Sequence, residues 1–277
     1  MILEYFSRND EVVLTGISDF DLTKTFECGQ CFRWDADEGG EYTGVVRGKA
    51  VRLRNENDNI IISCSVEDFE LVWRNYFDLD RNYKEIRELL SIDDFMLKAT
   101  EFGIGIRLLR QEKWEALCSF IISQCNNIPR IKKIITTLCR EFGDRFEYDG
   151  KDYYSFPSAQ KLASLDEHHL APLRCGYRAS YILSAAQDVS SGKLDLETLS
   201  KSSPEAARSV LKKLHGVGEK VADCAMLFGL NMLDTFPRDV WMNRAIAEYF
   251  SPSFDPAVFS PYAGIAQQYI FHYVRNG

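Results

Sequence analysis

The chain has 277 residues, of which 45% are hydrophobic and 27% are charged, and its formal net charge is −8 at pH 7. Such a chain is long enough for one large or two ordinary globular domains. It has no apolar run of membrane-spanning length, and its N-terminus has no basic stretch followed by an apolar one, so we expect neither a membrane span nor a signal peptide. The acidic charge disfavours general polyanion binding, so any nucleic-acid site must be a local patch.

Residues 11–65 contain short runs of β-branched and aromatic residues separated by the turn-rich segments DEGG, RGK and ENDN. This pattern predicts an antiparallel sheet. From residue 66 onward the apolar residues recur at helical spacing. We therefore predict an α+β fold, in which an N-terminal antiparallel sheet domain with flanking helices (1–105) packs on a mainly helical domain (106–277).

Eight cysteines are scattered along the chain, and most lie within apolar patterns. Cys28 and Cys31 form one CxxC, but no second cysteine pair and no histidine pair stands at the spacing of a zinc site. Packing as reduced thiols is therefore favoured over a metal or redox role. No four-cysteine cluster follows the helical region, which disfavours an iron–sulfur cluster.

The segment HGVGEKVADC (215–224) joins two predicted helices. Gly216 and Gly218 allow a tight turn with outward-facing N–H groups, and such a turn at the start of a helix binds anions. The alternative is a glycine C-cap followed by another helix, without a ligand. Lys220 lies just inside the second helix and four residues before Cys224, so the two side chains share one face.

Asp239 follows a Pro-Arg pair and precedes an apolar-periodic helix that begins at Val240. It occupies the N-cap position, and capping alone would explain it. A cap is also compatible with a catalytic role, because the start of a helix favours the ionised carboxylate. An amine near such a carboxylate is a nucleophile with an electrostatic partner.

Three further segments carry chemistry-bearing residues in the same chain: FECGQCFRW, GIRLLRQEKWEALCSFIISQCNNIPRI and CGYRASYI. Together with LHGVGEKVADC and FPRDVWM, they resemble the helix-hairpin-helix DNA glycosylase superfamily, and within it the 8-oxoguanine DNA glycosylases of the eukaryotic type, which also occur in bacteria. The likeness extends from about Gly16 to the C-terminus. It implies a monomeric enzyme of the prokaryotic cytoplasm and nucleoid that excises 8-oxoguanine from double-stranded DNA and cleaves the abasic site, with no cofactor and no catalytic metal.

The resemblance also implies roles for single residues. Lys220 would attack C1′ of the flipped nucleotide and form a Schiff base, and Asp239 would stabilise positive charge developing on the sugar. The carbonyl of Gly29 would accept a hydrogen bond from N7–H of 8-oxoguanine, which guanine lacks. A glycine that merely turns the chain is the alternative at this position.

The other base contacts implied by the resemblance lie on two helices. Cys224 would lie beneath the base, Gln267 would contact its Watson–Crick edge and Phe271 would stack on its ring. Gln267 and Phe271 are four residues apart and share a helix face, but Gln268, three residues from Phe271, could lie near the same face. For a lone Phe or Cys, packing in the core is the alternative.

Opposite the lesion, Arg130 and Arg178 match the two arginines that read cytosine in the family, and Tyr177 matches its wedging tyrosine. Cys125 stands where the family has a gap-filling asparagine, so the preference for cytosine is expected to be relaxed. Asn126 and Asn127 are candidates for helix caps.

The hairpin would hold a DNA phosphate, with a monovalent cation on its carbonyls as a further possibility. The implied phosphate-binding residues are Leu214, Gly216, Val217, Gly218 and Trp241, the last standing where the family usually has a histidine. Two alternative functions remain. A monofunctional alkylated-base glycosylase would lack Lys220, and a non-catalytic hairpin protein would not need Asp239, Gly29 and Phe271 together.

Overall fold

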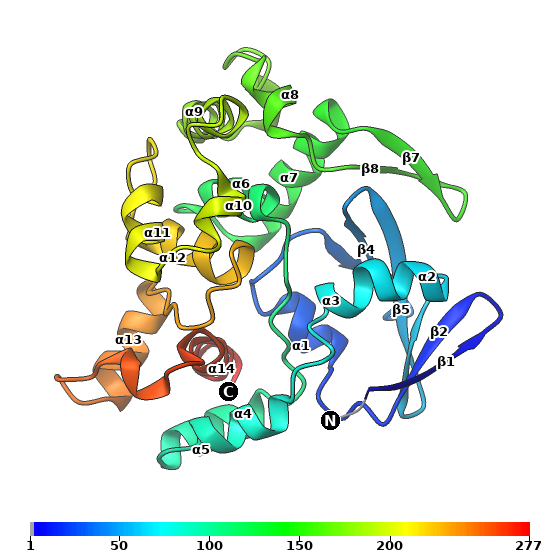
Figure 1. Cartoon of the computed structure of the whole chain (residues 1–277), viewed down its shortest axis with the longest axis vertical. Coiled ribbons are helices and arrows are strands. Elements are labelled where there is room, and N and C mark those ends of the chain that lie inside the picture. The colour runs from blue at the N-terminus through cyan, green and yellow to red at the C-terminus, as the bar shows by residue number, and fades with distance from the viewer. Residues whose placement is uncertain (1–2) are drawn as a thin grey trace. The chain divides into compact units, whose positions relative to one another are not determined.

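The computed structural model describes residues 3–277 (Figure 1). Its main sheet has six strands in the order β1-β2-β6-β5-β4-β3, and β2 pairs antiparallel with both β1 and β6. The strands are β1 (Glu4–Arg8), β2 (Glu11–Thr15), β3 (Trp34–Ala36), β4 (Tyr42–Val46), β5 (Lys49–Glu56) and β6 (Asn59–Ile62). The predicted α+β class, with strands first and helices after, is confirmed.

The contacts divide the chain into two compact units. Unit 1 contains the described residues up to Thr43, then Val51–Arg110 and Leu233–Gly277, and unit 2 contains Gly44–Ala50 and Gln111–Met232. We expected one division after residue 105, whereas the contacts return the C-terminal segment to the unit that holds most of the sheet.

Unit 1 combines most of the sheet with short helices and the C-terminal helices. Its helices are α1 (Leu22–Glu27), α2 (Val66–Asp68), the π-helix η1 (Phe69–Trp73), α3 (Arg74–Tyr76), α4 (Tyr83–Leu90), α5 (Asp94–Phe102), α13 (Val240–Tyr249), the 3-10 helix η4 (Pro256–Phe259) and α14 (Ala263–Asn276). Phe26 and Trp34 stack in its core with ring centroids 4.1 Å apart.

A cluster of buried side chains explains why the C-terminal segment belongs to unit 1. The apolar faces of α13 and α14, which include Met242 and Tyr269, pack against Tyr83 of α4 and Met96 of α5, and all four are at most 1% exposed. Burial of these faces is worth about 25 cal/mol per Å² of apolar surface and does not depend on position in the sequence.

Unit 2 is mainly helical. Its helices are α6 (Lys113–Ser123), α7 (Ile128–Phe142), α8 (Ala159–Ala163), the 3-10 helix η2 (Ala171–Leu173), α9 (Arg178–Ser190), α10 (Leu196–Leu199), α11 (Pro204–Leu211), α12 (Glu219–Cys224) and the π-helix η3 (Ala225–Gly229). Every residue of α6 from Ala116 to Ser123 is buried, and α6 packs against α7, α9 and α12. Helix α6 is thus the central helix of this unit.

A two-stranded antiparallel sheet, β7 (Arg145–Tyr148) and β8 (Lys151–Tyr154), interrupts the helices of unit 2 (Figure 1). We had expected helices throughout this region. Asp149 and Gly150 form the turn with φ of 50° and 69°, and two positive φ values are typical of a tight hairpin turn. The Asp-Gly pair between aromatic residues is the sequence signal for this hairpin.

Within residues 3–277, no helix combines the length and the apolar character that a membrane span requires.

Candidate active site

The predicted hairpin joins α11 and α12 in unit 2. Leu214 and Val217 are buried, while Gly216 adopts φ +76°. A Cβ at Gly216 would lie 2.2 Å from Cδ2 of Tyr181, so this position excludes side chains by backbone conformation and by space. Gly218 is exposed and has open space where a Cβ would be. No side chain of the described residues caps α12, so the N–H groups of its first turn are available to an anion.

Lys220 is half-buried at the second residue of α12. Its Nζ donates a hydrogen bond to Ser123 Oγ over 3.2 Å and lies 5.4 Å from the centroid of the Phe120 ring. Cys224 lies one helical turn after Lys220 and is 4% exposed. The predicted amine therefore lies at the C-terminal end of α6, within unit 2.

A buried ion pair joins the two helices of the hairpin. Asp223 of α12 is 6% exposed and accepts a hydrogen bond from Arg208 Nε of α11 over 2.7 Å. Burial raises the pKa of Asp223, and Arg208 offsets part of that effect. Because an unpaired buried carboxylate is costly, this pair holds α11 and α12 together.

The predicted opposite-base residues lie at the ends of α6, α7 and α9. Cys125 is exposed with φ +46°, and Tyr177 is 52% exposed. Arg130 is also exposed, and its Nη2 donates to Arg174 O over 3.2 Å. Asn127 is the N-cap of α7, as expected, because its side chain accepts from Arg130 N.

Arg178 differs from this group, because it is only 4% exposed. Its guanidinium donates from Nε to Gln124 O over 2.9 Å, from Nη2 to Cys125 O over 3.2 Å and from Nη1 to Cys175 O over 3.1 Å. In this structure these donors form hydrogen bonds with backbone carbonyl groups of the protein. This use could not be predicted from the sequence, because the carbonyl groups of Gln124 and Cys125 lie more than fifty positions from Arg178.

In unit 1, the segment around Gly29 is held by buried hydrogen bonds. Gly29 adopts φ +87°, which a glycine accepts without strain. Gln30 is fully buried: its Nε2 donates to Thr25 O and Arg107 O over 2.9 and 2.7 Å, and its Oε1 accepts from Leu109 N over 2.9 Å. Sequence reasoning missed Gln30, because a glutamine in a loop carries no sign of such partners.

Cys28, on the other side of Gly29, is also buried. Its Sγ donates to Thr25 O over 3.3 Å, and burial raises the pKa of the thiol to about 11. Both neighbours of Gly29 are therefore fixed by the surrounding core, and Cys28 is a packed thiol at neutral pH.

Helix α14 carries Gln267 and Phe271 one turn apart. Gln267 is 5% exposed, and its Oε1 accepts from Gln268 Nε2 over 2.7 Å. Gln268 is equally buried, at 4% exposure, so burial does not separate the two glutamines. Phe271 is half-buried and packs against the cluster shared by α4, α5 and α13.

Asp239 is the N-cap of α13, as predicted, and its Oδ1 accepts from Met242 N over 2.8 Å. It is half-buried and belongs to unit 1, whereas Lys220 belongs to unit 2. Trp241 is 43% exposed, with the Arg244 guanidinium 5.5 Å from its ring centroid.

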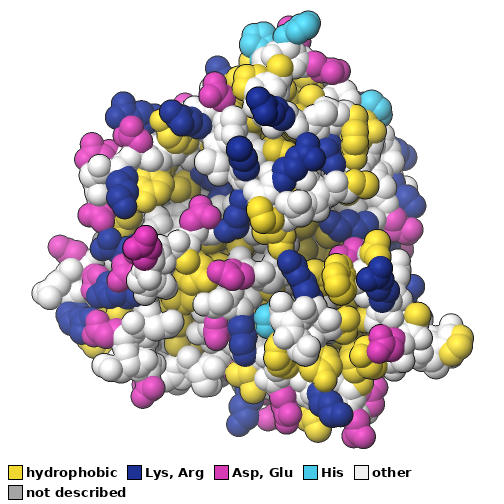
Figure 2. Space-filling model, turned by 180° about the vertical axis from the view of Figure 1, so that it is seen from behind, with side chains coloured by type: hydrophobic (Ala, Val, Ile, Leu, Met, Phe, Trp, Pro, Cys, Tyr) yellow, Lys and Arg dark blue, Asp and Glu magenta, His cyan; other side chains and the backbone are white. Residues whose placement is uncertain are grey.

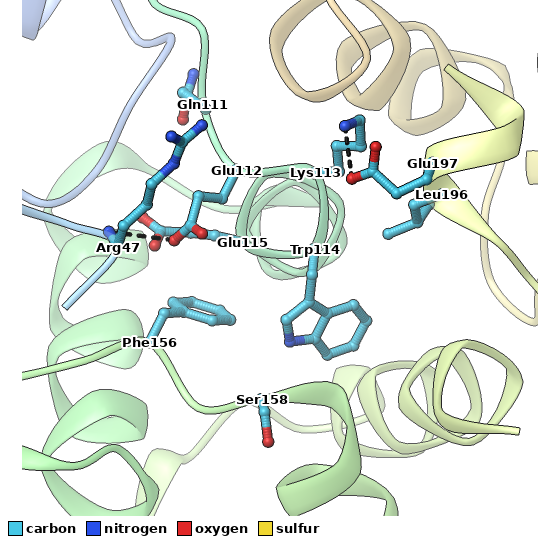
Figure 3. A pocket seen from close by; sticks show the side chains of 10 residues that line it. All are labelled: Arg47, Gln111, Glu112, Lys113, Trp114, Glu115, Phe156, Ser158, Leu196 and Glu197. Carbon is cyan, nitrogen blue, oxygen red and sulfur yellow. Dashed lines mark hydrogen bonds and ion pairs between the residues drawn. The ribbon is translucent and has the colours of Figure 1, made fainter. Parts of the chain in front are cut away.

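A cavity of about 400 Å³ in unit 2 lies apart from these residues. Trp114, Phe156 and Leu196 contribute apolar walls, and Lys113 is paired with Glu197 over 2.7 Å (Figure 3). None of the predicted site residues lines it.

No group of three or more His, Cys, Asp or Glu side chains within residues 3–277 could hold a metal ion, and no disulfide joins the eight cysteines found there. Figure 2 shows basic and acidic side chains interspersed over the face that it presents.

Comparison with known proteins identifies the chain as a member of the helix-hairpin-helix class of base excision DNA repair proteins. Residues 118–257 match the family model of the HhH-GPD superfamily of base excision DNA repair proteins, and residues 12–117 match that of the 8-oxoguanine DNA glycosylase N-terminal domain. The chain belongs to the 8-oxoguanine DNA glycosylase family of this superfamily.

Three relatives illustrate the similarity. An N-glycosylase/DNA lyase of Saccharomyces cerevisiae is 34% identical over 82% of this chain and 67% of its own. The structure of MBOgg1 in complex with a low-affinity DNA ligand has a TM-score of 0.94 and 44% identity, over 99% of both chains. The Clostridium acetobutylicum 8-oxoguanine glycosylase/lyase, in complex with dsDNA containing cytosine opposite 8-oxoG, has a TM-score of 0.91 and 37% identity, over 99% of this chain and 98% of that chain.

Proposed function

We propose that this protein excises 8-oxoguanine from duplex DNA and then cleaves the strand at the abasic site. Family membership supports the substrate class. The observation that carries the bifunctional chemistry is Lys220, a half-buried amine in the first turn of α12, immediately after the hairpin. An enzyme that used water as its nucleophile would have no need of an amine there.

Lys220 performs the nucleophilic step. Its lone pair forms a bond to C1′, while the bond from C1′ to N9 breaks and its electron pair leaves with the base, which takes up a proton. Opening of the sugar ring gives the Schiff base between Nζ and C1′. Loss of a proton from C2′ then expels the 3′ phosphate by β-elimination. Asp239, the N-cap residue of α13, stabilises positive charge on the sugar during these steps.

The lesion is distinguished from guanine by one hydrogen. The carbonyl of Gly29 accepts N7–H of 8-oxoguanine, and it would face a lone pair at N7 of guanine. The buried hydrogen bonds of Gln30 support this role, because they fix the adjoining backbone. Phe271 stacks on the ring, Gln267 contacts the Watson–Crick edge, and Cys224 lies beneath the base.

The hairpin residues Leu214, Gly216, Val217 and Gly218 bind the phosphate backbone of the lesion strand, and Trp241 supplies an indole N–H to a phosphate. The N–H groups of Leu214 and Val217 donate to Leu211 O and Leu214 O, so the donors to the phosphate are the N–H groups of Gly216 and Gly218. A monovalent cation on the hairpin carbonyls is compatible with the turn. Leu214 O accepts one hydrogen bond, from Val217 N over 3.1 Å, which leaves it a second lone pair. The protein acts as a monomer in the nucleoid of a prokaryotic cytoplasm.

Opposite the lesion, Tyr177 fills the gap in the base stack and Arg130 donates to the acceptor edge of cytosine. Their exposure supports this assignment. Cys125 is shorter than asparagine and a weak hydrogen-bond donor, so cytosine is preferred but other partners are processed.

Borohydride trapping tests the proposal. Wild type is incubated with duplexes that carry 8-oxoguanine opposite each of the four bases, and the trapped adduct and the released base are both measured. We expect the adduct and released 8-oxoguanine with wild type, and no adduct with Lys220→Gln, which keeps the approximate length but removes the amine. Base release without any trapped adduct would instead identify a monofunctional glycosylase. Undiminished trapping by Lys220→Gln would exclude Lys220 as the nucleophile.

A further inference from the structure

Ser123, the last residue of α6, holds the Lys220 amine in a directed hydrogen bond. The residue is 8% exposed, and its Oγ donates to Phe120 O over 2.8 Å. A carbonyl can only accept, so the hydroxyl proton is committed to that bond. What Ser123 offers Lys220 is therefore an oxygen lone pair, and the Nζ lies 3.2 Å away.

This arrangement has a chemical consequence. A serine with an uncommitted proton would donate to the lone pair of an uncharged amine and so compete with its attack on carbon. Ser123 can only accept an N–H, which leaves the amine lone pair directed away from the oxygen. The hydroxyl thus orients the amine without masking its lone pair.

A second group from α6 limits the position of the amine. The Phe120 ring lies 5.4 Å from Nζ and stacks on Phe228 of η3, with ring centroids 5.1 Å apart and planes inclined by 17°. Ser123 and Phe120 come from one turn of the central helix of unit 2. The amine is therefore held by a rigid element rather than by a loop.

The end of α6 is itself fixed at the next two residues. Gln124 O and Cys125 O both accept from the buried guanidinium of Arg178. Ser123 directly precedes these two residues. The hydrogen bonds from Arg178 therefore also help to fix the position of the Ser123 hydroxyl.

We propose that Ser123 is a positioning residue for the nucleophile: its hydroxyl, with its proton committed to Phe120 O, orients the Lys220 amine for attack on C1′. This inference rests on the proposed role of Lys220 as the nucleophile. It assigns to Ser123, which acts through the Lys220 amine, a selective effect on the rate of Schiff-base formation.

The test compares Ser123→Ala, Ser123→Thr and the matched control Ser119→Ala, in which another buried serine is truncated one turn earlier in the same helix. Affinity for a lesion duplex and single-turnover trapping are measured for each protein. Trapping is measured on the lesion duplex and on a duplex with a preformed abasic site, which isolates the amine chemistry from base excision. Thermal unfolding measures the structural cost.

We expect Ser123→Ala to trap both duplexes about tenfold more slowly, the usual effect of one hydrogen bond, with unchanged affinity. Ser123→Thr should restore the rate, because it keeps the hydroxyl. Wild-type trapping rates in Ser123→Ala, an equal loss in Ser119→Ala, or a Ser123→Thr protein as slow as Ser123→Ala would each overturn the positioning role. Failure of wild type to trap either duplex would instead reject the proposed function.

Discussion

Arg178 holds the backbone carbonyl of Gln124 with its Nε 2.9 Å from the oxygen, and it is nearly inaccessible to solvent. Arg130, the other arginine predicted to read cytosine, is exposed and donates to a single protein carbonyl, Arg174 O. In the free protein, Arg178 is therefore a buried structural residue, whereas Arg130 is exposed. We expect their substitutions to have different effects.

Arg130→Ala should reduce the preference for cytosine, because it removes donors directed to the opposite base. We expect the ratio of excision opposite cytosine to excision opposite adenine to fall about tenfold. Arg178→Ala should slow excision opposite all four bases alike and lower the melting temperature, because it removes the donor to the carbonyls of Gln124, Cys125 and Cys175. Single-turnover excision on four duplexes checks both. A selective loss in Arg178→Ala alone would assign the reading of cytosine to Arg178 instead.

Cys125→Asn should sharpen the preference for cytosine. Asparagine is larger than cysteine, fills the gap opposite the lesion better and adds amide donors and an acceptor. It also adopts positive φ more readily than most residues, and Cys125 has φ +46°, so the substitution should not lower the melting temperature. The measurement is the same set of four excision rates. An unchanged ratio would show that residue 125 does not contribute to partner selection.

Gly218→Ala should fold normally and weaken DNA binding. A Cβ there meets no atom within 4 Å, but it would project from the exposed turn that we assign to a phosphate. Because phosphate contacts carry no sequence information, affinity for lesion and undamaged duplexes should fall by the same factor. Fluorescence anisotropy with both duplexes measures this. Loss of affinity for the lesion duplex alone would place Gly218 in the base site.

Gly216→Ala, unlike Gly218→Ala, should destabilise the fold. It combines φ +76° with a Cβ 2.2 Å from the Tyr181 ring, so we expect a clearly lower melting temperature, since left-handed backbone alone costs roughly 1–2 kcal/mol for a residue with a side chain.

Asp239→Asn should distinguish the helix-capping role of Asp239 from the role of its negative charge in catalysis. The amide oxygen can still accept from Met242 N, which Asp239 Oδ1 does over 2.8 Å, so the variant should fold with a near-native melting temperature. Without the carboxylate, excision should slow by about a hundredfold or more. Single-turnover excision and thermal unfolding are measured together. Near-wild-type excision by this variant would leave Asp239 with capping as its only role.

Stability should depend on pH through His272 of α14. Burial, followed by the charge of Lys24, lowers the pKa of this imidazole below its ordinary value. The folded protein therefore binds fewer protons at this site than the unfolded chain. The contribution is fully present above about pH 6.5, the ordinary value, and is lost as the pH falls through the folded-state pKa.

Urea unfolding between pH 7.5 and pH 5 measures this effect in wild type and in His272→Gln, which cannot titrate in that range. The free energy of unfolding of wild type should fall more than that of the variant as the pH decreases. Parallel curves would show that His272 does not contribute to the acid sensitivity.

The sequence predicted features that depend on local pattern. The strands between residues 11 and 65, the turn at Gly216 and the cap at Asp239 follow from spacing, backbone freedom and capping chemistry, all of which act over a few residues. Strand β1 (Glu4–Arg8) lies before the region in which strands were predicted. The hairpin of β7 and β8 also had a local signal, the Asp-Gly pair, but the surrounding helical pattern obscured it.

The supporting contacts of the candidate site could not be predicted in this way. Ser123 meets Lys220 across 97 positions, and Gln30 meets Leu109 across 79. Serine and glutamine occur in helices and loops for many reasons, so neither residue type indicates its partner. Only the packing of α6 against α12, and of the Gly29 segment against residues 107–109, brings these groups together.

The buried amide of Gln30 has a consequence for how lesion recognition could change. Its three backbone partners order the Gly29 segment in the free protein. The carbonyl that we propose for recognition is therefore preorganised, and binding incurs little further loss of conformational entropy there. Main-chain atoms cannot be exchanged by substitution. A shift toward a differently shaped oxidised base would therefore require moving this backbone, and Gln30, which touches no DNA in our proposal, is the residue through which such a shift would act.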